Sequence, residues 1–288
     1  MRILITGKNG YVGLSLQRWL SQWNDKYIID TIDVRTEDWK NEDFSKYDAL
    51  FHAAAVVHKY EKPHMKDYYY KVNRDLTIEL AMKAKQSGIK QFIFMSSMSV
   101  YGLEGIVNQK TVIDQETVCK PNSEYGRSKL AAELELNKLD DPSFGVAIVR
   151  APMIYGPDCP GNYGRLKKLV LKTPIAPLMD NQRSMIFVDN LSEFIRLILV
   201  YNDRGIFFPQ NRDFVNTTEL IKLIALNNAR KVIISKLLGL GVKLIGSKVN
   251  TLNKVFGNLV FEKQLSNYRN FEYCVADLTK SVEITEMK

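Results

Sequence analysis

Residues 3–13 read Ile3-Leu-Ile-Thr-Gly7-Lys-Asn-Gly10-Tyr-Val-Gly13, and this stretch decides the fold. The apolar run at its start predicts a buried strand, and the three glycines lead into an amphipathic segment that predicts a helix. Glycine lets the backbone turn tightly and approach a diphosphate, and a helix N-terminus adds free N–H groups and a positive dipole end. The stretch therefore predicts a dinucleotide-binding turn, with a plain glycine-rich turn as the alternative. The expected cofactor contacts in it are Gly7, Gly10, Tyr11, Val12 and Gly13.

Short apolar runs continue to alternate with amphipathic segments through the first half of the chain. Strands are expected near residues 3–5, 27–32, 48–52, 92–95 and 146–149, and a helix over 73–87. Such alternation is typical of a parallel sheet with helices on both faces. We therefore expect an α/β fold with a doubly wound parallel sheet of Rossmann type. Its dinucleotide-binding domain would span residues 1–150, with a smaller, mixed substrate-binding region over 151–288 and residues 182–205 packing back onto the first domain.

Charge and composition narrow the class of protein. The chain has 288 residues, with 40 Lys and Arg against 32 Asp and Glu, for a formal net charge of +8. The excess is uneven: residues 1–150 hold 21 basic and 20 acidic residues, and residues 151–288 hold 19 and 12. A uniformly basic nucleic-acid-binding protein is therefore a poor description, and no nucleic-acid partner is expected.

The location is predicted from what the chain lacks. The first apolar run breaks at Gly7, too early for a secretory signal, and no stretch approaches the roughly 20 apolar residues of a membrane span. The three cysteines, Cys119, Cys159 and Cys274, are too few and too scattered for a disulfide framework. We therefore expect a cytoplasmic protein.

The end of the second predicted strand bears on the choice of cofactor. Asp33 lies 20 residues after Gly13, where a carboxylate accepts hydrogen bonds from an adenosine ribose, which favours NAD. Arg35 could instead meet the 2′-phosphate of NADP. A third reading is that Asp33 is only a turn residue at a strand end. The cofactor is thus NAD(H) or NADP(H).

A tyrosine and a lysine four residues apart form the candidate catalytic pair. Tyr125 and Lys129 follow Pro121-Asn-Ser123, which is suited to a helix start, so both side chains share one helix face. A nearby ammonium favours the phenolate, so we expect a lowered Tyr125 pKa and an acid–base role. The same pattern recurs at Tyr163-Gly-Arg-Leu-Lys167. We choose Tyr125 because the polar strand end Ser96–Gly102 precedes it, and doubly wound sheets bind ligands at strand ends.

These motifs together resemble the extended short-chain dehydrogenase/reductases, the NAD-dependent epimerase/dehydratase family. The resemblance covers about residues 1–205 and rests on the glycine turn, His52-Ala-Ala-Ala55, Asn73, Ser96–Gly102, Tyr125 to Lys129, Arg150–Gly156 and Asn181–Leu191. Members act on nucleotide sugars as epimerases, dehydratases and reductases, so the resemblance implies a UDP-sugar substrate.

The resemblance also assigns roles to residues. Tyr125 would exchange the proton, Lys129 would hold the nicotinamide ribose, and Ser97 would hydrogen-bond the reacting oxygen. The other implied cofactor contacts are Asp43, Phe44, Ala53, Ala54, Asn73 and Pro152. The implied substrate contacts are Ser97, Ser99, Tyr125, Asn162 and Arg183, the last of which would meet the substrate diphosphate, with a solvated loop arginine as the alternative.

The residues after Ser97 select among the family's reactions. Dehydratases carry an Asp-Glu pair there, since eliminating water needs an additional acid and base, whereas this chain has Met98-Ser99. Met153 stands where UDP-galactose 4-epimerases carry an asparagine. The chain is most similar to reductases of capsule and O-antigen pathways that reduce the 4-keto group of a UDP-2-acetamido-2,6-dideoxy-4-hexulose. A UDP-sugar 4-epimerase with tightly held NAD and a non-catalytic dinucleotide sensor are the alternatives.

Two further features of the sequence bear on metal binding and on partners. His52, His58 and His64 lie at intervals of six, which suits neither one helix face nor the usual metal-ligand spacing, so no metal is expected. Residues 220–263 carry eight basic residues and only Glu262, interleaved with apolar pairs. This segment is either a peripheral contact to an anionic membrane, at its inner face, or a solvated helix face. The sequence leaves the oligomeric state open, with a homodimer among the alternatives.

Overall fold

The computed structural model describes residues 1–57 and 65–287. It divides into two compact units, each built from three separate segments of the chain. Unit 1 comprises Met1–Gly102, Val118–Ala151 and Ser192–Pro209, and unit 2 comprises Leu103–Thr117, Pro152–Leu191 and Gln210–Lys288.

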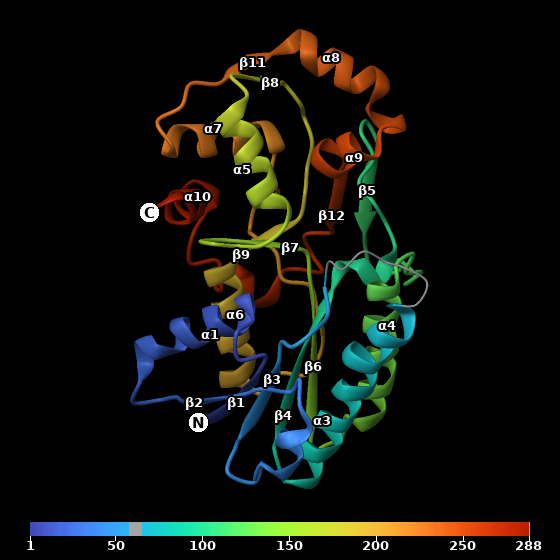
Figure 1. Cartoon of the computed structure of the whole chain (residues 1–288), viewed down its shortest axis with the longest axis vertical. Coiled ribbons are helices and arrows are strands. Elements are labelled where there is room, and N and C mark those ends of the chain that lie inside the picture. Colours follow the sequence, from blue (N-terminus) through green and yellow to red (C-terminus); the bar gives the residue numbers. More distant parts are fainter. Residues whose placement is uncertain (58–64, 288) are drawn as a thin grey trace. The chain divides into compact units, whose positions relative to one another are not determined.

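A six-stranded parallel sheet forms the centre of unit 1 (Figure 1). Its strands are β1 (Arg2–Thr6), β2 (Ile28–Ile32), β3 (Ala49–His52), β4 (Gln91–Ser97), β6 (Gly145–Ala151) and β10 (Gly205–Phe207). They lie in the order β10-β6-β4-β3-β1-β2, and each neighbouring pair is parallel. The predicted doubly wound α/β sheet is therefore confirmed.

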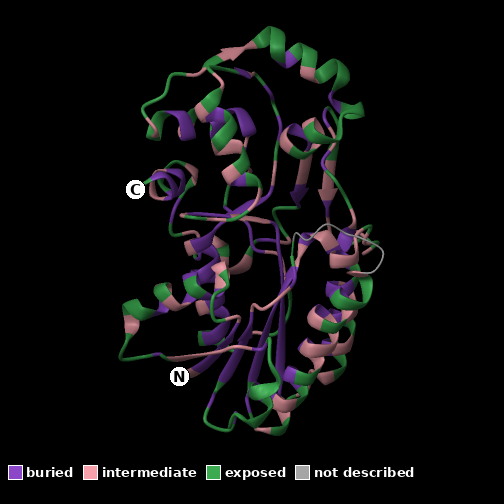
Figure 2. Ribbon diagram, in the orientation of Figure 1, coloured by how far each residue is buried: buried purple, intermediate pink, exposed green. Residues whose placement is uncertain are grey.

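Helices cover both faces of this sheet. Figure 1 shows α3 (Leu76–Gln86) and α4 (Glu124–Leu139) on one face, and α1 (Tyr11–Leu20) and α6 (Val188–Tyr201) on the other. Strands β3, β4 and β6 are buried along almost their entire length, as Figure 2 shows in purple, because covered parallel strands have no solvated face. Leu50, Phe92 and Ile148 of these strands pack with Leu80 and Leu136 of the covering helices in one core.

The helix predicted over residues 73–87 has a more complex start. It begins with α2 (Lys66–Tyr70), continues through a π-helical turn at Lys71–Asp75 and ends as α3. Asn73, one of the predicted cofactor contacts, lies in the π-helical turn and is fully buried.

Unit 2 has three two-stranded parallel pairs and five helices among its described residues. The pairs are β5 (Lys110–Ile113) with β12 (Asn258–Phe261), β7 (Met153–Tyr155) with β9 (Met185–Phe187), and β8 (Ile175–Pro177) with β11 (Ile233–Ser235). The helices are α5 (Asn162–Lys172), α7 (Thr217–Asn227), α8 (Lys236–Ile245), α9 (Asn250–Phe256) and α10 (Leu278–Glu286).

The unit boundaries differ from the expected ones at residues 103–117. The sequence placed this segment in the first domain, whereas it belongs to unit 2 because β5 pairs with β12, about 150 positions later in the chain. Residues 192–209 belong to unit 1, where β10 adds the sixth strand beside β6. Within the described residues, no helix is long and apolar enough to cross a membrane.

Candidate active site

The glycine turn closes tightly between β1 and α1. Gly7 has a φ of 83°, which favours glycine, and the Gly10 N–H donates to its carbonyl oxygen at 2.7 Å. A Cβ on Gly7 would lie 3.3 Å from the backbone of Ala54, and one on Gly13 would lie 3.3 Å from Ile5 Cγ2. Side chains at these positions would therefore fill the turn and separate it from β1 and β3.

The N-terminus of α1 fits a diphosphate. Its cap residue, Gly10, has no side chain to occupy the free N–H groups, and its first turn holds no acidic residue, so no carboxylate of the helix itself neutralises its positive end. Strand β1 pairs with β2 on one side and with β3 on the other, which makes the ends of β1 and β3 the switch point of the sheet. Open α/β sheets bind dinucleotides at this point, so the residues present fit the predicted cofactor.

Asp33 and Arg35 are bound to each other after β2. The Arg35 Nε donates to both Asp33 carboxylate oxygens at 3.0 Å, and Arg35 Nη2 also contacts Oδ2. These bonds lower the pKa of Asp33 to about 2. The Asp33 carboxylate is therefore ionised and able to accept a hydrogen bond from an adenosine ribose hydroxyl. The exposed Arg35 guanidinium lies beside this carboxylate, so it suits the 2′-phosphate of NADP equally well.

The side chain of Asn73 is hydrogen-bonded to other residues of the protein. Its side-chain oxygen accepts from the Val56 N–H at 2.8 Å, and its amide nitrogen donates to the Val56 carbonyl and to Ser128 Oγ, each at 3.1 Å. All of its amide hydrogens are thereby used. Asn73 is thus a positioning residue that joins the segment after β3 to α4, and its predicted contact with the cofactor stays a prediction.

Asp43 and Phe44 divide between surface and core. Asp43 is exposed and accepts from the Ser45 N–H and hydroxyl, whereas Phe44 is 1% exposed and packs in the core against Tyr47. The ring of Phe44 is therefore part of the core of unit 1. The predicted adenine contacts of Asp43 and Phe44 stay predictions, with the backbone of Phe44 as its available part.

Ser97, Ser99 and Tyr125 form a directed hydrogen-bond chain at the carboxyl end of β4. The Ser99 N–H and hydroxyl both donate to Ser97 Oγ, at 3.2 and 3.0 Å. A hydroxyl has two acceptor positions and one hydrogen, so the Ser97 hydrogen is left for another oxygen. It is directed at Tyr125, whose hydroxyl is hydrogen-bonded to Ser97. Ser99 thus polarises Ser97 toward the phenol.

The expected lowering of the Tyr125 pKa is wrong in this structure. Burial of the hydroxyl raises that pKa to about 12, and the hydrogen bond from Ser97 only partly opposes the rise. Burial outweighs charge because the Lys129 ammonium is directed elsewhere: Nζ donates to the Met95 carbonyl at 2.7 Å and lies 4.3 Å from the centroid of the Phe94 ring. Tyr125 is therefore a neutral phenol and a proton donor at neutral pH.

Lys129 is the most deeply buried cation of the site, with 1% of its surface exposed. Burial lowers its pKa to about 7, and the Glu133 carboxylate one helical turn later opposes that shift. Lys129 therefore titrates near neutrality in the protein alone.

Sequence reasoning missed an ion pair beneath these residues. Glu133 of α4 binds Arg150 of β6 at 2.6 Å and also accepts from Ser96, while Arg150 Nη1 donates to the Tyr101 hydroxyl at 2.8 Å. Glu133 and Arg150 are both buried. Their pair fixes α4 against β4 and β6 at the level of Lys129. The four-residue spacing from Tyr125 to Lys129 to Glu133 was a signal that could have identified it.

The second tyrosine–lysine pair has a structural partner in unit 2. The Tyr163 hydroxyl donates to Glu286 Oε1 at 2.8 Å, and Lys167 Nζ lies 2.6 Å from Glu286 Oε2. Glu286 is buried at the end of α10. Tyr163 and Lys167 thus connect α5 to α10, which gives this second pair a structural role. The choice of Tyr125 as the catalytic tyrosine stays a prediction.

Three predicted ligand contacts belong to unit 2. Pro152 is buried before β7, and Asn162 is exposed at the first position of α5. Arg183 pairs through its backbone with Val215, and its Nη1 donates to the Lys254 carbonyl at 2.7 Å. Burial lowers the pKa of Arg183, and among the described residues no carboxylate lies within ion-pair distance of it. Within the described residues its printed side-chain partners are backbone carbonyls, and its predicted contact with a substrate diphosphate stays a prediction.

His52 is a structural residue. Its ring nitrogens are hydrogen-bonded to Thr6 Oγ1 at 2.7 Å and Thr77 Oγ1 at 2.9 Å, and burial lowers its pKa to about 3. His58 and His64 lie outside the described residues. Within the described ranges no group of three or more metal-ligating side chains comes together, and the three cysteines are free thiols.

Comparison with known proteins defines the family. Residues 3–207 match the family model described as the NAD dependent epimerase/dehydratase family. The chain belongs to this family. The match confirms the resemblance drawn from the sequence, and the family is one of NAD-dependent enzymes. The glycine turn and the Tyr125 region of this chain both lie within the matched residues.

Two curated 4-epimerases share just under 30% of their aligned residues with this chain. The UDP-glucose 4-epimerase of Vibrio cholerae is 29% identical over 78% of this chain and 75% of its own length. The N-acetyl-alpha-D-glucosaminyl-diphospho-ditrans,octacis-undecaprenol 4-epimerase of Escherichia coli O157:H7 is 28% identical over 67% of this chain and 62% of its own length.

Solved structures share the fold. A UDP-glucuronic acid 4-epimerase from Bacillus cereus in complex with NAD has a TM-score of 0.73 at 17% identity, over 99% of this chain and 97% of the other. A dTDP-4-dehydrorhamnose reductase from Bacillus anthracis in complex with NADP has a TM-score of 0.63 at 22% identity, over 81% and 82%. Identities this low establish the fold, and both cofactors occur within it.

Proposed function

We propose that the protein uses NADH or NADPH to reduce the 4-keto group of a UDP-2-acetamido-2,6-dideoxy-4-hexulose, in nucleotide-sugar biosynthesis for capsule or O-antigen. The observation that carries the proposal is the chain Ser99–Ser97–Tyr125 at the carboxyl end of β4, in the same unit as the glycine turn. Dehydration is disfavoured because Met98 and Ser99 supply neither of the extra acid–base groups that it needs.

The reaction needs two additions to the carbonyl group. The cofactor, when bound, supplies hydride to the carbonyl carbon. When the substrate binds, the Ser97 hydroxyl turns its one hydrogen from Tyr125 to the carbonyl oxygen as negative charge develops there. Tyr125 transfers its phenolic proton to the same oxygen. A C–H and an O–H bond form, the carbonyl π bond breaks, and the tyrosinate regains its proton from solvent.

The protonation state of Tyr125 supports reduction as the starting direction. With a pKa of about 12, Tyr125 begins as an acid at neutral pH, as reduction requires. Epimerisation begins with removal of a proton from a sugar hydroxyl, which requires a base.

The substrate class is supported by the relatives and by Arg183. One curated relative is named for UDP-glucose, and a structural neighbour is named for UDP-glucuronic acid. The Arg183 guanidinium, which has only carbonyl partners among the described residues, suits a substrate diphosphate. Met153 stands where UDP-galactose 4-epimerases carry an asparagine, which speaks for a different sugar.

A 4-epimerase is the second candidate, because two of the curated relatives carry that name. The deciding experiment incubates the protein with NADH or NADPH and a UDP-4-keto-6-deoxy-N-acetylhexosamine. We expect stoichiometric cofactor oxidation and one 4-hydroxy product. Interconversion of UDP-hexoses without added cofactor, and no oxidation of NADH or NADPH, would establish the epimerase instead.

A further inference from the structure

The basic segment 220–263 divides into parts with different environments. Between Leu220 and Phe261 the chain has no acidic residue. In α7 the apolar residues Leu220, Ile221 and Ile224 are buried, and in β12 Val260 and Phe261 are buried. Figure 2 shows α8, in contrast, green along nearly its whole length. The apolar residues of the basic segment that lack a role in the core therefore lie mainly on α8.

Helix α8 exposes its leucines and packs against unit 2 through its glycines. Leu237, Leu240 and Leu244 recur at the spacing of one helix face and are 79%, 58% and 80% exposed. The opposite face packs through glycine: a Cβ on Gly239 would collide with the carbonyl oxygen of Leu178, and one on Gly246, just after α8, would lie 2.9 Å from Val107. The helix thus lies close against unit 2 through its smallest residues and presents its leucines outward.

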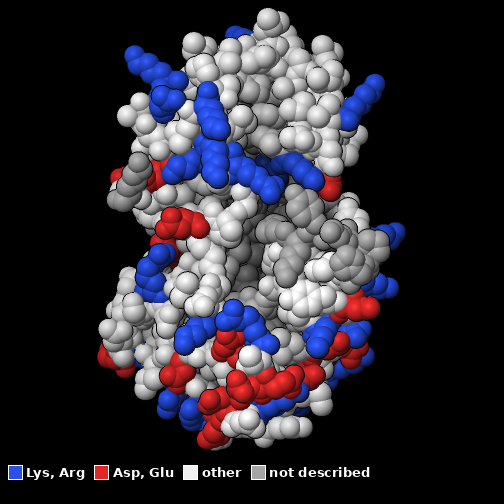
Figure 3. Space-filling model, viewed as in Figure 1, with Lys and Arg blue, Asp and Glu red and all other residues white. Residues whose placement is uncertain are grey.

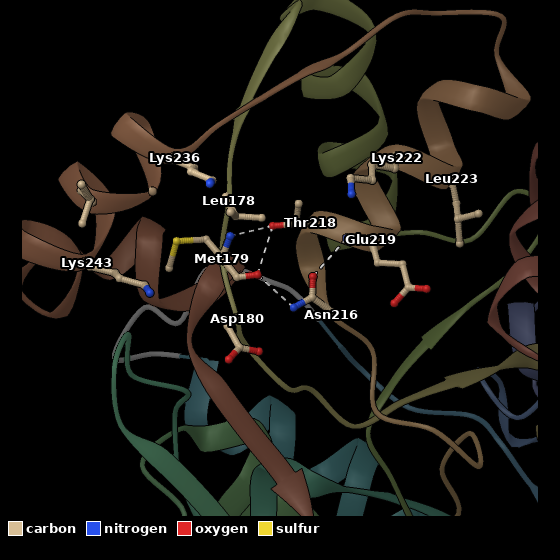
Figure 4. A pocket seen from close by; sticks show the side chains of 12 residues that line it. Leu178, Met179, Asp180, Asn216, Thr218, Glu219, Lys222, Leu223, Lys236 and Lys243 are labelled. Atoms are coloured by element: carbon tan, nitrogen blue, oxygen red, sulfur yellow. Dashed lines mark hydrogen bonds between the residues drawn. The ribbon is translucent and has the colours of Figure 1, made fainter.

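Lysines border the leucine face. Lys236 and Lys243, seven positions apart on α8, lie along the edge between the outward and inward faces. With Lys222 of α7 they line a cavity of about 810 Å³, which also holds Asp180 and Glu219. Figure 4 shows the ammonium groups of Lys236 and Lys243 pointing from α8 toward residues 178–180. In Figure 3 the surface over α8 is white and blue without red.

We propose that α8 docks on an anionic phospholipid bilayer. Its leucines enter the boundary between headgroups and acyl chains. The exposed, flexible side chains of Lys236 and Lys243 turn from residues 178–180 to the lipid phosphates, as expected of an interfacial helix with a basic border. Charge complementarity favours this occupant over a second copy of the chain. Two copies joined through the leucine face would bring the α8 lysines of one copy toward those of the other, and α8 itself has no acidic residue to pair them. The carboxylates near these lysines, Asp180 and Glu219, lie in the pocket and not on the leucine face.

The test measures sedimentation of the full chain with vesicles of phosphatidylcholine containing 0 or 30% phosphatidylglycerol. We expect binding to the anionic vesicles that weakens as salt is raised from 0.1 to 0.5 M. Two double variants should each weaken this binding at least tenfold. Lys236→Glu/Lys243→Glu removes two lysines that each contribute about a factor of five near the surface. Leu240→Glu/Leu244→Glu replaces two apolar side chains of the inserting face by carboxylates.

Matched controls carry equal changes in unit 1. Met82→Glu/Leu134→Glu alters two apolar residues, one of α3 and one of α4, that are 46% and 56% exposed. Lys26→Glu/Lys90→Glu makes the same change in net charge as the lysine variant, at two exposed lysines. Both controls should bind within twofold of the unchanged protein. Equal binding by all variants, or no binding to anionic vesicles, would overturn the proposal. So would a dimer in sedimentation velocity that Leu240→Glu/Leu244→Glu converts to monomer while vesicle binding is retained.

This inference is independent of the proposed reaction. The α8 variants lie outside the catalytic residues and should oxidise cofactor with a soluble nucleotide sugar at the unchanged rate. Binding to vesicles without reduction of the ketone would refute the proposed function alone. Reduction of the ketone without binding to vesicles would refute the docking surface alone.

Discussion

Tyr125 and Tyr163 begin two five-residue segments that differ only at the fourth position, Ser128 against Leu166. Sequence spacing could not separate them, because both place a lysine on the same helix face as the tyrosine. Their partners separate them: Tyr125 is hydrogen-bonded to Ser97, and Tyr163 is bound to Glu286. Such partners depend on residues far away in the chain, which no local pattern records.

This pair of segments allows a matched comparison at single-atom level. Tyr125→Phe removes the proton that the alkoxide takes up, so kcat should fall about 10²–10⁴-fold while the cofactor Kd is unchanged. Tyr163→Phe removes one hydrogen bond to a carboxylate that keeps Lys167, so it should cost about 1 kcal/mol of stability and leave kcat intact. Steady-state kinetics and urea unfolding of both variants check this. A full loss of activity in Tyr163→Phe would reverse the assignment.

Lys129 makes stability depend on pH. Its folded pKa, about 7, is below the unfolded value of about 10.4, so between these values the unfolded state binds the additional proton and stability rises with pH. Relative to Lys129→Met, the unchanged protein should gain about 1.4 kcal/mol per pH unit between pH 7.5 and 9.5. Urea unfolding across this range measures the difference. A flat difference would mean that Glu133 keeps Lys129 charged throughout.

At the scale of elements, α4 is held against the turn after β4 by a glycine. A Cβ on Gly126 would lie 2.6 Å from the Ser99 carbonyl oxygen and 3.0 Å from Pro121 Cβ. The first turn of α4 therefore approaches the Ser97–Ser99 turn as closely as backbones allow, which sets the distance from Ser97 to Tyr125.

Replacing this glycine should uncouple activity from stability. Alanine normally stabilises a helix interior by about 1 kcal/mol relative to glycine. Gly126→Ala should instead push α4 away from Ser99 and lower kcat at least tenfold. The matched variant is Gly164→Ala in α5, where a Cβ meets only the Cys159 carbonyl oxygen at 3.8 Å. It should raise stability by about 0.5–1 kcal/mol without affecting kcat. Equal kcat values for both variants would contradict this account.

The sheet of unit 1 was predictable for a physical reason. Its strands are buried on both faces, so they read as continuous apolar runs, and the turn glycines mark where β1 ends. The three-residue strands of unit 2, such as β7 and β11, are too short to show a period, and their partners lie far away in sequence. The pairing of β5 with β12, and hence the unit boundary at residue 103, could not be derived from local pattern.

At the scale of the whole molecule, unit 1 is completed by a segment that returns after unit 2 has begun. Gln91 at the start of β4 donates from Nε2 to the carbonyls of Ile198 and Asp203, at 3.1 and 2.9 Å, and is 2% exposed. These bonds secure the end of α6 and the approach to β10 across more than 100 residues of chain.

Removing this connection should be costly. Gln91→Leu removes a buried side-chain donor from two carbonyl groups, of which that of Ile198 keeps the Asp203 N–H. The full chain should therefore lose about 1–3 kcal/mol of unfolding free energy. The exposed Gln22 offers the control, since Gln22→Leu removes a local bond to the Trp19 carbonyl and should change stability by less than about 0.5 kcal/mol. Urea titration compares them, and equal midpoints would show that the returning segment is held by other contacts.

The π-helical turn at Lys71–Asp75 has a consequence for alignment with relatives. A π-helical turn accommodates about one more residue than an α-helical turn, while the helices on either side keep their ordinary phase. A relative with an unbroken α-helix here should therefore be one residue shorter, and its gap belongs within residues 71–75. An alignment that puts the gap elsewhere would shift Asn73 out of register and match the wrong residue to the side chain that joins Val56 to Ser128.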